Sequence, residues 1–209
     1  MKLLFSLCCI AVLLWGCDDA YYNDGGILEE NVGVYEGTTM DYLESQPVMF
    51  DTLSTLIKLN GLEADVNRPG STFFAPQDYS IYNYLLLKYP DPKNRPKTLE
   101  AIPAEDMAEI AEGIKNYIIP DVQIRRGGLS TIYSFSTTLM GRKARFNLVR
   151  EDYLGNPNMG AAYITYSLNM SAEGASERYQ SAKVVVADMT TTNGLVHVLV
   201  ADTHIFGFN

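Results

Sequence analysis

The apolar run from Leu195 to Val200 restricts the fold more than any other part of this sequence. Alternate residues of an extended segment point to opposite faces, and every residue of this run except His197 is Leu or Val. A strand that is apolar on both faces is typical of the covered interior of a sheet. Asn193-Gly194 is a turn signal directly before it. The chain therefore needs further strands beside this one and layers on both of its faces.

Other β-rich runs precede this strand in the second half of the chain. Residues 132–139 and 144–149 are joined through Met140-Gly141-Arg142-Lys143, which predicts a hairpin. Residues 163–168 and 184–187 predict two more strands, and the long stretch between Arg150 and Gln180 predicts an elaborated hairpin. The second half therefore supplies an antiparallel set of strands.

The first half has mostly helical patterns. Thr38 to Asp41 predicts a capping box that opens a short helix, which must stop before Pro47. Apolar residues then recur at helical spacing from Phe50 to Ile57, and Asn60-Gly61 predicts the end of that helix. Further helices are predicted over 81–87, with Asp78 as the cap, and over 103–118, whereas residues 71–75 form a short apolar strand. Helices first and strands later predict a single α+β domain.

The N-terminal segment predicts export and lipid attachment. A positive start is followed by the apolar run Leu3 to Trp15, which is too short to span a bilayer as a helix. It ends in Leu14-Trp15-Gly16-Cys17, which resembles a bacterial lipobox with Cys17 as the acylated residue. An ordinary signal peptide with an incidental cysteine is the alternative. We expect a signal peptide over 1–16, a lipidated cysteine and acidic tether over 17–36, and the domain over 37–209.

The positions of the cysteines and the composition of the tether both agree with export and lipid attachment. Cys8 and Cys9 lie in the segment predicted to be removed, so Cys17 alone remains and no intramolecular disulfide is possible. Asp18 and Asp19 begin a Gly-containing acidic stretch, which resembles the surface-export signal of Bacteroidota lipoproteins. The expected location is the outer membrane, lipid-anchored and facing the cell surface. A periplasmic orientation is the alternative.

Net charge excludes two classes of partner. Removal of residues 1–16 leaves 15 basic and 25 acidic residues, a formal charge of −10. Such a domain is a poor candidate for binding nucleic acid, whose phosphates require Lys and Arg. It is equally poor as a peripheral binder of anionic lipid headgroups.

Few residues indicate catalysis. The chain has two histidines, and His197 on its apolar strand is expected to be a hydrogen-bonded core residue. Ligands at zinc spacing, a nucleophile elbow, a phosphate loop and a dinucleotide fingerprint are all missing from the sequence, so we predict no cofactor, no metal and no enzyme activity. The acid pairs Glu105-Asp106 and Glu151-Asp152 would suit glycoside hydrolysis, but adjacent acids are more often surface charge.

Tyrosines are the main candidates for binding. They gather in the segment from 79 to 89 and in the hairpin region from 153 to 179, and exposed tyrosines stack on sugars or anchor protein interfaces. The alternative is that they fill the core. The candidate binding surface consists of Tyr79, Tyr82, Tyr84, Tyr89, Tyr153, Tyr163 and Tyr166.

Two blocks of sequence resemble the fasciclin (FAS1) family. Residues 50–62 followed by 72–78 are similar to its first block, a helix, a Gly-Leu step and a "TvFAPtn" strand-turn, and residues 184–199 are similar to its second block. Met140-Gly141 is similar to the family's "T-x-x-G" hairpin. Thr72, Phe74, Ala75, Pro76, Asn193, Gly194 and His197 are the motif residues that we expect to be structural.

The resemblance implies a wedge of β-strands covered by several helices, and an interaction or adhesion role. Many members have a Tyr-His pair after the middle helix, whereas this chain has Tyr117-Ile118, so roles that depend on that pair do not carry over. We expect a non-catalytic module that binds envelope or extracellular proteins or glycans, with help in nutrient capture as one use. A structural subunit of an envelope complex and a glycan hydrolase are the alternatives.

Overall fold

The structure, a computed structural model, describes residues 33–172 and 174–208. Cys17, the predicted signal peptide and most of the predicted tether lie outside these residues. The helices are α2 (Thr39–Glu44), α3 (Pro47–Leu59), α4 (Glu63–Val66), α5 (Asp78–Lys88) and α6 (Ala104–Lys115). The strands are β1 (Ser71–Ala75), β2 (Ile118–Ile119), β3 (Ser134–Thr137), β4 (Lys143–Arg150), β5 (Ala162–Asn169), β6 (Tyr179–Thr190) and β7 (Gly194–Leu199). Short 3-10 turns occupy Leu99–Ala101, Arg126–Gly128 and Phe206–Phe208.

The seven strands form one sheet in the order β2-β1-β7-β6-β5-β4-β3. β1 pairs with β7 in parallel, and the other neighbours are antiparallel. β6 changes partner along its length, because it pairs with β5 from Tyr179 to Lys183 and with β7 from Val184 to Thr190. Register shifts beyond Val184 mark bulges, which bend a strand and increase its twist.

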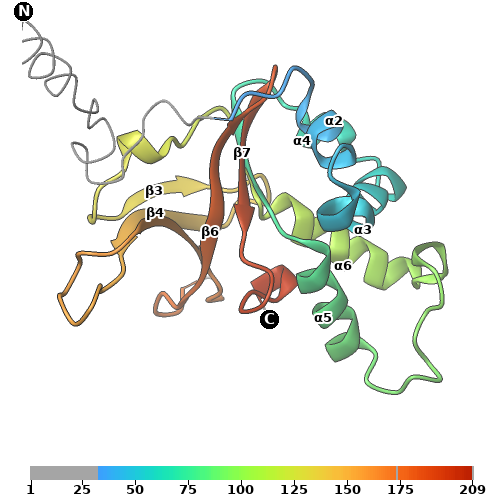
Figure 1. Cartoon of the computed structure of the whole chain (residues 1–209). Helices are drawn as coiled ribbons and strands as arrows, with labels where there is room; N and C mark the ends of the chain where they lie inside the picture. Colours follow the sequence, from blue (N-terminus) through green and yellow to red (C-terminus); the bar gives the residue numbers. More distant parts are fainter. Residues whose placement is uncertain (1–32, 173, 209) are drawn as a thin grey trace, which may run out of the picture. The chain divides into compact units, whose positions relative to one another are not determined.

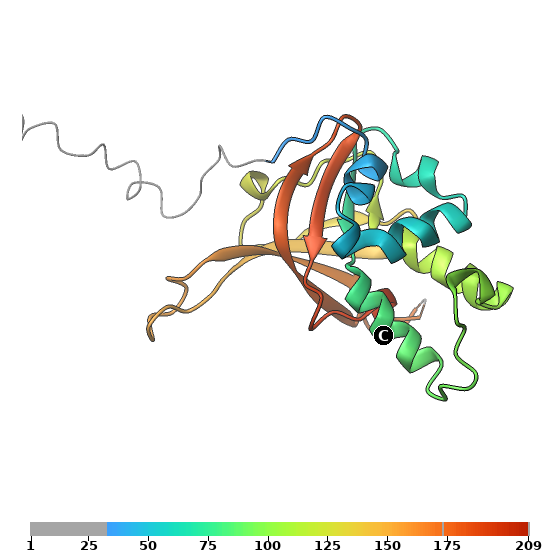
Figure 2. The ribbon, with the colours of Figure 1, turned by 45° about the vertical axis from the view of Figure 1, so that its right-hand side comes forward.

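β7 is the covered central strand that its sequence predicts. All six of its residues are buried, and it lies between β1 and β6. The helices gather on one side of β6 and β7, whereas the loop between β4 and β5 projects away at the opposite end (Figures 1 and 2). A single hydrophobic core joins the helices to the sheet. The expected α+β class and the wedge of strands covered by helices are confirmed.

Local signals set the bounds of the first helices. The Thr38 side chain accepts a hydrogen bond from the Asp41 N–H and the Asp41 carboxylate accepts from the Thr38 N–H, so the predicted capping box at the start of α2 is confirmed. α3 begins at Pro47 and ends before Asn60. Gly61 follows with a φ of +62°, in the left-handed region that Gly adopts without steric cost.

Asp78 does not cap its own helix, and this part of the prediction is wrong. Gln77 precedes α5 and makes no side-chain cap bond. α3 is interrupted at Phe50, whose φ and ψ are not helical, so a second helix start lies just beyond it. The Asp78 carboxylate accepts the N–H groups of Thr52 at 2.8 Å and Leu53 at 3.0 Å there. Asp78 therefore caps the second part of α3 from a distance in sequence.

The sheet also holds the last residues of the predicted tether. Val34 forms a parallel bridge with Thr190, and the Tyr35 N–H donates to the Thr190 carbonyl at 2.8 Å. Contacts with the sheet thus begin before residue 37. Within the described ranges, no helix has the length and apolar character that crossing a membrane requires.

Candidate binding site

α5 presents two of the candidate tyrosines to solvent. Tyr79 and Tyr82 lie three residues apart on the helix and are 55% and 53% exposed. Ile81 and Tyr84 are buried on the side of α5 that faces the core. The helix therefore divides the tyrosine cluster between a solvent face and a core face.

Two candidate tyrosines belong to the core, so their assignment to a binding surface is wrong. Tyr84 is 4% exposed, and its hydroxyl donates to Glu109 at 2.9 Å. Tyr166 is fully buried, stacks on Phe74 with ring centroids 4.4 Å apart, and donates its hydroxyl to the Asn116 carbonyl. Strand alternation explains Tyr166, because β5 turns every second residue toward the helices.

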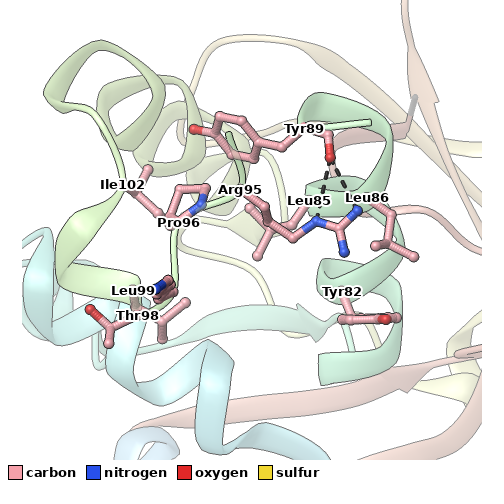
Figure 3. A pocket seen from close by; sticks show the side chains of 10 residues that line it. Tyr82, Leu85, Leu86, Tyr89, Arg95, Pro96, Thr98, Leu99 and Ile102 are labelled. Atoms are coloured by element: carbon pink, nitrogen blue, oxygen red, sulfur yellow. Dashed lines mark hydrogen bonds between the residues drawn. The ribbon is translucent and has the colours of Figure 1, made fainter. Parts of the chain in front are cut away.

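A hollow of about 230 Å³, which we call the α5 pocket, lies between α5 and the segment that follows it. Figure 3 shows Tyr82 on the α5 side and Thr98 and Leu99 across from it. The Arg95 guanidinium donates to the Tyr89 carbonyl through Nε at 3.4 Å and Nη2 at 3.2 Å, which holds the loop against the helix. The lining residues are Tyr82, Leu85, Leu86, Tyr89, Arg95, Pro96, Lys97, Thr98, Leu99 and Ile102.

The pocket has apolar walls, two cationic side chains and no carboxylate in its lining. Such a site suits a ligand that stacks an apolar face on a ring and offers hydrogen-bond acceptors at its edge. Sequence reasoning identified Tyr82 and Tyr89 but missed Arg95 and the segment 96–102. This segment could have been found from the sequence, because the Pro-rich connection after α5 contains three basic residues between Lys93 and Lys97 in an otherwise acidic chain.

Tyr89 is also tied to an ion-pair network behind the pocket. Its hydroxyl donates to Asp106, and Lys88 contacts both Asp106, at 2.9 Å, and Glu109. Burial raises the pKa of Tyr89 to about 12, and the hydrogen bond to Asp106 adds to this. The Tyr89 hydroxyl and the Lys88 ammonium in turn lower the pKa of the Asp106 carboxyl. The Asp106 carboxylate is therefore bound by Tyr89 and Lys88 at the end of α5, whereas the side chain of its neighbour Glu105 is exposed to solvent.

The second acid pair is divided in the same way. Glu151 forms an ion pair with Lys183, and Asp152 accepts the backbone N–H of Asn158 at 2.9 Å within the β4–β5 loop. Tyr153 on this loop is 60% exposed. Each carboxylate is engaged with a different partner, so the two do not face each other across a shared cleft.

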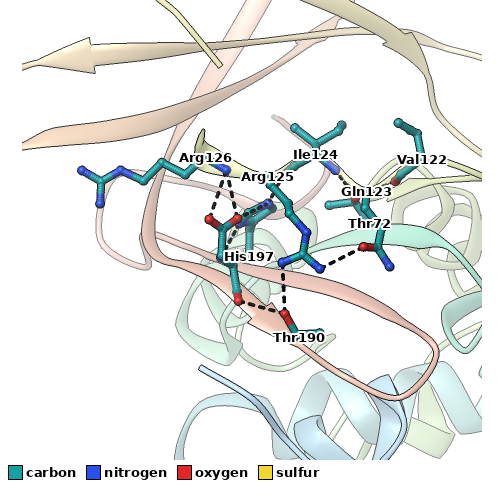
Figure 4. A network of polar contacts seen from close by, with 9 residues as sticks. Thr72, Val122, Gln123, Ile124, Arg125, Arg126, Thr190 and His197 are labelled. Carbon is teal, nitrogen blue, oxygen red and sulfur yellow. Dashed lines mark hydrogen bonds and ion pairs between the residues drawn. The ribbon is translucent and has the colours of Figure 1, made fainter. Parts of the chain in front are cut away.

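The motif residues of β1 lie inside the fold. The Thr72 hydroxyl donates to the Val122 carbonyl at 2.7 Å and accepts the Ile124 N–H at 2.9 Å, which fixes the chain after β2 (Figure 4). Phe74 is fully buried and packs on the His197 ring, with centroids 5.0 Å apart. Ala75 and Pro76 are buried too.

His197 is buried and hydrogen-bonded at both ring nitrogens. Nε2 donates to the Ile124 carbonyl at 2.7 Å, and Nδ1 accepts the Asp188 N–H at 3.1 Å. These partners specify the neutral tautomer with the proton on Nε2. Burial lowers the pKa of His197, against the opposing effects of the Ile124 carbonyl and Asp188. A histidine with both nitrogens occupied in the core has no free position for a ligand.

Asp188 and two arginines surround this histidine. The Asp188 carboxylate accepts the Arg126 N–H at 3.0 and 3.1 Å, and the Arg125 guanidinium donates to the Thr190 hydroxyl at 3.2 Å (Figure 4). Asp188 has a φ of +59°, which Asp tolerates better than most residues. The network joins the segment after β2 to β6 and β7, which is a structural role.

Asn193 and Gly194, the turn signal before β7, each have a structural role that involves a segment distant in sequence. The Asn193 side-chain oxygen accepts the Thr39 N–H at 2.8 Å, so it satisfies a backbone group at the start of α2. At its own turn the same oxygen accepts from the Thr191 hydroxyl at 3.3 Å. Gly194 is not among the residues with positive φ. A Cβ there would lie 2.8 Å from the Ser71 carbonyl oxygen, so Gly is required by the close approach of β1.

The remaining candidates lie apart from α5. Tyr163 is partly exposed on β5, beneath the Lys183 ammonium at 4.1 Å from its ring centroid, and Tyr153 is on the projecting loop. Tyr79 and Tyr82 on α5 are thus apart from Tyr153 and Tyr163 on the β4–β5 hairpin, since α5 and β4 are well separated in Figure 1. In the described ranges, no group of three or more His, Cys, Asp or Glu residues is placed to hold a metal ion.

Comparison with known proteins identifies the domain. The family model of the Fasciclin domain matches residues 48–201, which is most of the chain. No curated protein matches the sequence. The matched range runs from α3 through the end of β7 and includes both the α5 pocket and the His197 network.

Proposed function

Since the chain belongs to the fasciclin domain family, we propose that it is a non-catalytic binding and adhesion module of the cell envelope. In this proposal lipid on Cys17 holds the domain at the outer membrane, the acidic tether separates it from the lipid, and the domain faces outward. The lipobox-like Leu14 to Cys17 supports the anchor, and the acidic residues from Asp18 support the orientation.

The α5 pocket and its exposed tyrosines are the single observation that carries the binding role. Tyr79 and Tyr82 expose aromatic surface beside a hollow whose walls are apolar and whose loop is fixed by Arg95. Exposed aromatic rings next to hydrogen-bond donors suit the stacking of a sugar ring or an aromatic anchor of a partner protein. We propose neutral glycans as the first class of ligand to test there.

Binding is tested with the mature chain carrying Cys17→Ser and a panel of neutral polysaccharides and envelope proteins. A Tyr79→Ala/Tyr82→Ala variant should weaken saturable binding by about tenfold or more, since one stacking contact contributes on the order of 1 kcal/mol. Tyr153→Ala, which removes a ring of similar exposure at the other end of the molecule, is the matched control. An equal loss in both variants would refute the assignment to α5.

The anchor has its own test. Cys17→Ser in the full precursor should abolish labelling by a fatty-acid probe and release the protein from the membrane fraction. On intact cells, added protease should remove the domain if it faces outward. Labelling that persists in the variant would refute lipidation, and full protection on intact cells would refute surface display.

The non-catalytic part of the proposal is tested by following products in the same incubations. We expect saturable binding without turnover. Hydrolysis of any glycan that is lost in Glu151→Gln or Asp152→Asn would overturn it, although the separate partners of these two carboxylates argue against a shared reaction.

A further inference from the structure

The charge of this chain is divided very unevenly along its length. Residues 122–187 contain eight Lys or Arg and four Asp or Glu, which gives this part a formal charge of +4. The rest of the chain has the other eight basic residues and 21 acidic ones, a charge of −13. The net charge of −9 therefore conceals a basic region, and that region contains β3, β4, β5 and the first part of β6.

Strand register places three of these cations on one face of the sheet. Arg145 of β4 is opposite Phe135 of β3, Lys143 is opposite Thr137, and Lys183 of β6 is opposite Thr165 of β5. The alternate residues of β4, among them Ala144 and Phe146, are buried in the core. Lys143, Arg145 and Lys183 therefore lie on the face of these strands that is turned away from the core.

Aromatic rings alternate with these cations on the same face, which we call the outer sheet face. The Arg145 guanidinium lies between two rings, 4.0 Å from the centroid of Tyr133 and 3.9 Å from that of Tyr179. The Lys183 ammonium is 4.1 Å from the centroid of Tyr163. Lys143 lies over Phe135 at 4.9 Å, and the Phe135 ring is 55% exposed. Cation–π contacts hold the cations in place without neutralising them.

Only part of the positive charge on this face is balanced. Glu177 pairs with Lys143 at 2.7 Å, and Glu151 pairs with Lys183. Both pairs are about half exposed, and such pairs contribute little and exchange readily with other anions. Among the residues that the structure describes, no carboxylate lies within ion-pair distance of Arg145. Its guanidinium is therefore oriented by two rings and acts on Glu177 only through its charge, which helps to lower the pKa of the Glu177 carboxyl.

A hollow of about 360 Å³ continues this face where β6 separates from β5. Strand pairing between them stops at Lys183, and the hollow is lined beyond that point by Arg126, Tyr163 and Val185, among others. The Arg126 guanidinium reaches it and donates to the Ala162 carbonyl at 2.9 Å. No carboxylate side chain belongs to the lining. The hollow thus adds a fourth cation, Arg126, beside the Tyr163 ring and the Lys183 ammonium of the outer sheet face.

We propose that the outer sheet face binds an acidic polysaccharide, a glycan chain that carries carboxylate or sulfate groups. Aromatic rings provide the stacking surface that sugar rings use, and the intervening cations provide partners for the acidic groups. The proposal rests on the binding role proposed above, but it assigns a second surface with a different class of ligand. Net charge is a sum over the whole chain, so it does not describe the basic residues of this one face.

The aromatic residues favour a glycan over the acidic half of a second copy of the chain. A protein contact driven by charge alone would not need rings placed beside each cation. In addition, the extended row from β3 to β6 crosses several strands at about 4.8 Å spacing, which suits a linear chain of repeated anionic groups. Association between copies remains a distinct outcome of the experiment.

The test measures binding of polygalacturonate and dextran sulfate to the mature chain carrying Cys17→Ser, with uncharged dextran as the reference. Binding to both polyanions and not to dextran is expected, and it should weaken as salt screens the exposed charges. Arg145→Gln/Lys183→Gln should weaken it by about tenfold or more. Lys58→Gln/Lys93→Gln, which removes the same charge from the helical half, should change it by less than about twofold.

Four further measurements distinguish the possible outcomes. Arg145→Lys/Lys183→Arg should retain most binding, and thermal unfolding of each variant should show that loss of binding is not loss of folding. Tyr79→Ala/Tyr82→Ala should leave polyanion binding unchanged, so failure at the outer sheet face is distinguishable from failure at α5. Equal effects of the two Gln pairs would overturn the proposal. Self-association by sedimentation that Arg145→Gln/Lys183→Gln abolishes, without polyanion binding, would also overturn it.

Discussion

We predict that the free energy of unfolding of this domain depends on the protonation of His204, at pH values above those at which most carboxylates titrate. Its side chain is 3% exposed, and Nε2 lies 2.9 Å from the Tyr117 hydroxyl. That hydroxyl accepts the Gly207 N–H at 2.8 Å, and donation of its own proton to Nε2 is the arrangement that satisfies its donor as well. His204 is therefore a neutral acceptor, and burial lowers its pKa from 6.5 to about 4.

The magnitude follows from proton linkage. A folded-state pKa below the unfolded one means that the unfolded chain binds more protons between these values, so stability is full above pH 6.5 and falls as the pH decreases toward 4. The difference between 6.5 and about 4, at about 1.4 kcal/mol per pH unit, limits the loss to about 3 kcal/mol. By pH 5 the same linkage gives a loss of about 2 kcal/mol.

Urea unfolding at pH 7.5 and pH 5.0 measures this loss in the mature chain carrying Cys17→Ser, with and without His204→Gln. Gln cannot titrate, so the decrease in unfolding free energy between the two pH values should be about 2 kcal/mol smaller in the variant. Buried His197 and the carboxylates are present in both proteins, and their contributions cancel in the comparison. An equal decrease in both proteins would refute the burial and neutral state of His204.

Three further predictions concern residues whose tasks the fold assigns, each measured as a free energy of unfolding. Asp78→Ala should cost about 1–2 kcal/mol because it removes the cap of the second part of α3, and Asp78→Asn, which keeps one acceptor, should cost less. Gly194→Ala should destabilise by more than about 1 kcal/mol, because its Cβ would meet the Ser71 carbonyl oxygen at 2.8 Å; an unchanged value would mean that β1 moves aside freely. Asn193→Ala and His197→Ala should each cost about 1–3 kcal/mol by leaving backbone partners unpaired, and two unaffected proteins would reopen a binding role for His197.

Part of the fold is visible in local sequence because local physics decides it. The capping box at Thr38, the end of α3 at Asn60-Gly61 and the turn before β7 depend on residues within a few positions of one another. The burial of β7 on both faces follows from its composition, since no other placement covers so many Leu and Val side chains. The family resemblance, carried by these same segments, agrees with the match over residues 48–201.

The surfaces are less visible in the sequence. α5 has Tyr and Leu around most of its circumference, so its sequence does not indicate which side faces the core. The assignment of Tyr84 to the surface is wrong for this reason. The cap at Asp78 is missed for a related reason. Its partners, Thr52 and Leu53, are more than 20 residues away and come near only when α3 and α5 pack together.

Helix ends, the central strand and the family can thus be inferred from the sequence, and so can the excess of basic residues between positions 122 and 187. The exposure of each tyrosine, the need for glycine at position 194 and the place of Arg145 between Tyr133 and Tyr179 follow from three-dimensional packing. The two kinds of feature differ in the sequence separation between the residues that interact. Caps, turns and apolar periodicity act over one or two turns of chain, whereas burial and cross-strand contacts depend on register between strands that are far apart in sequence.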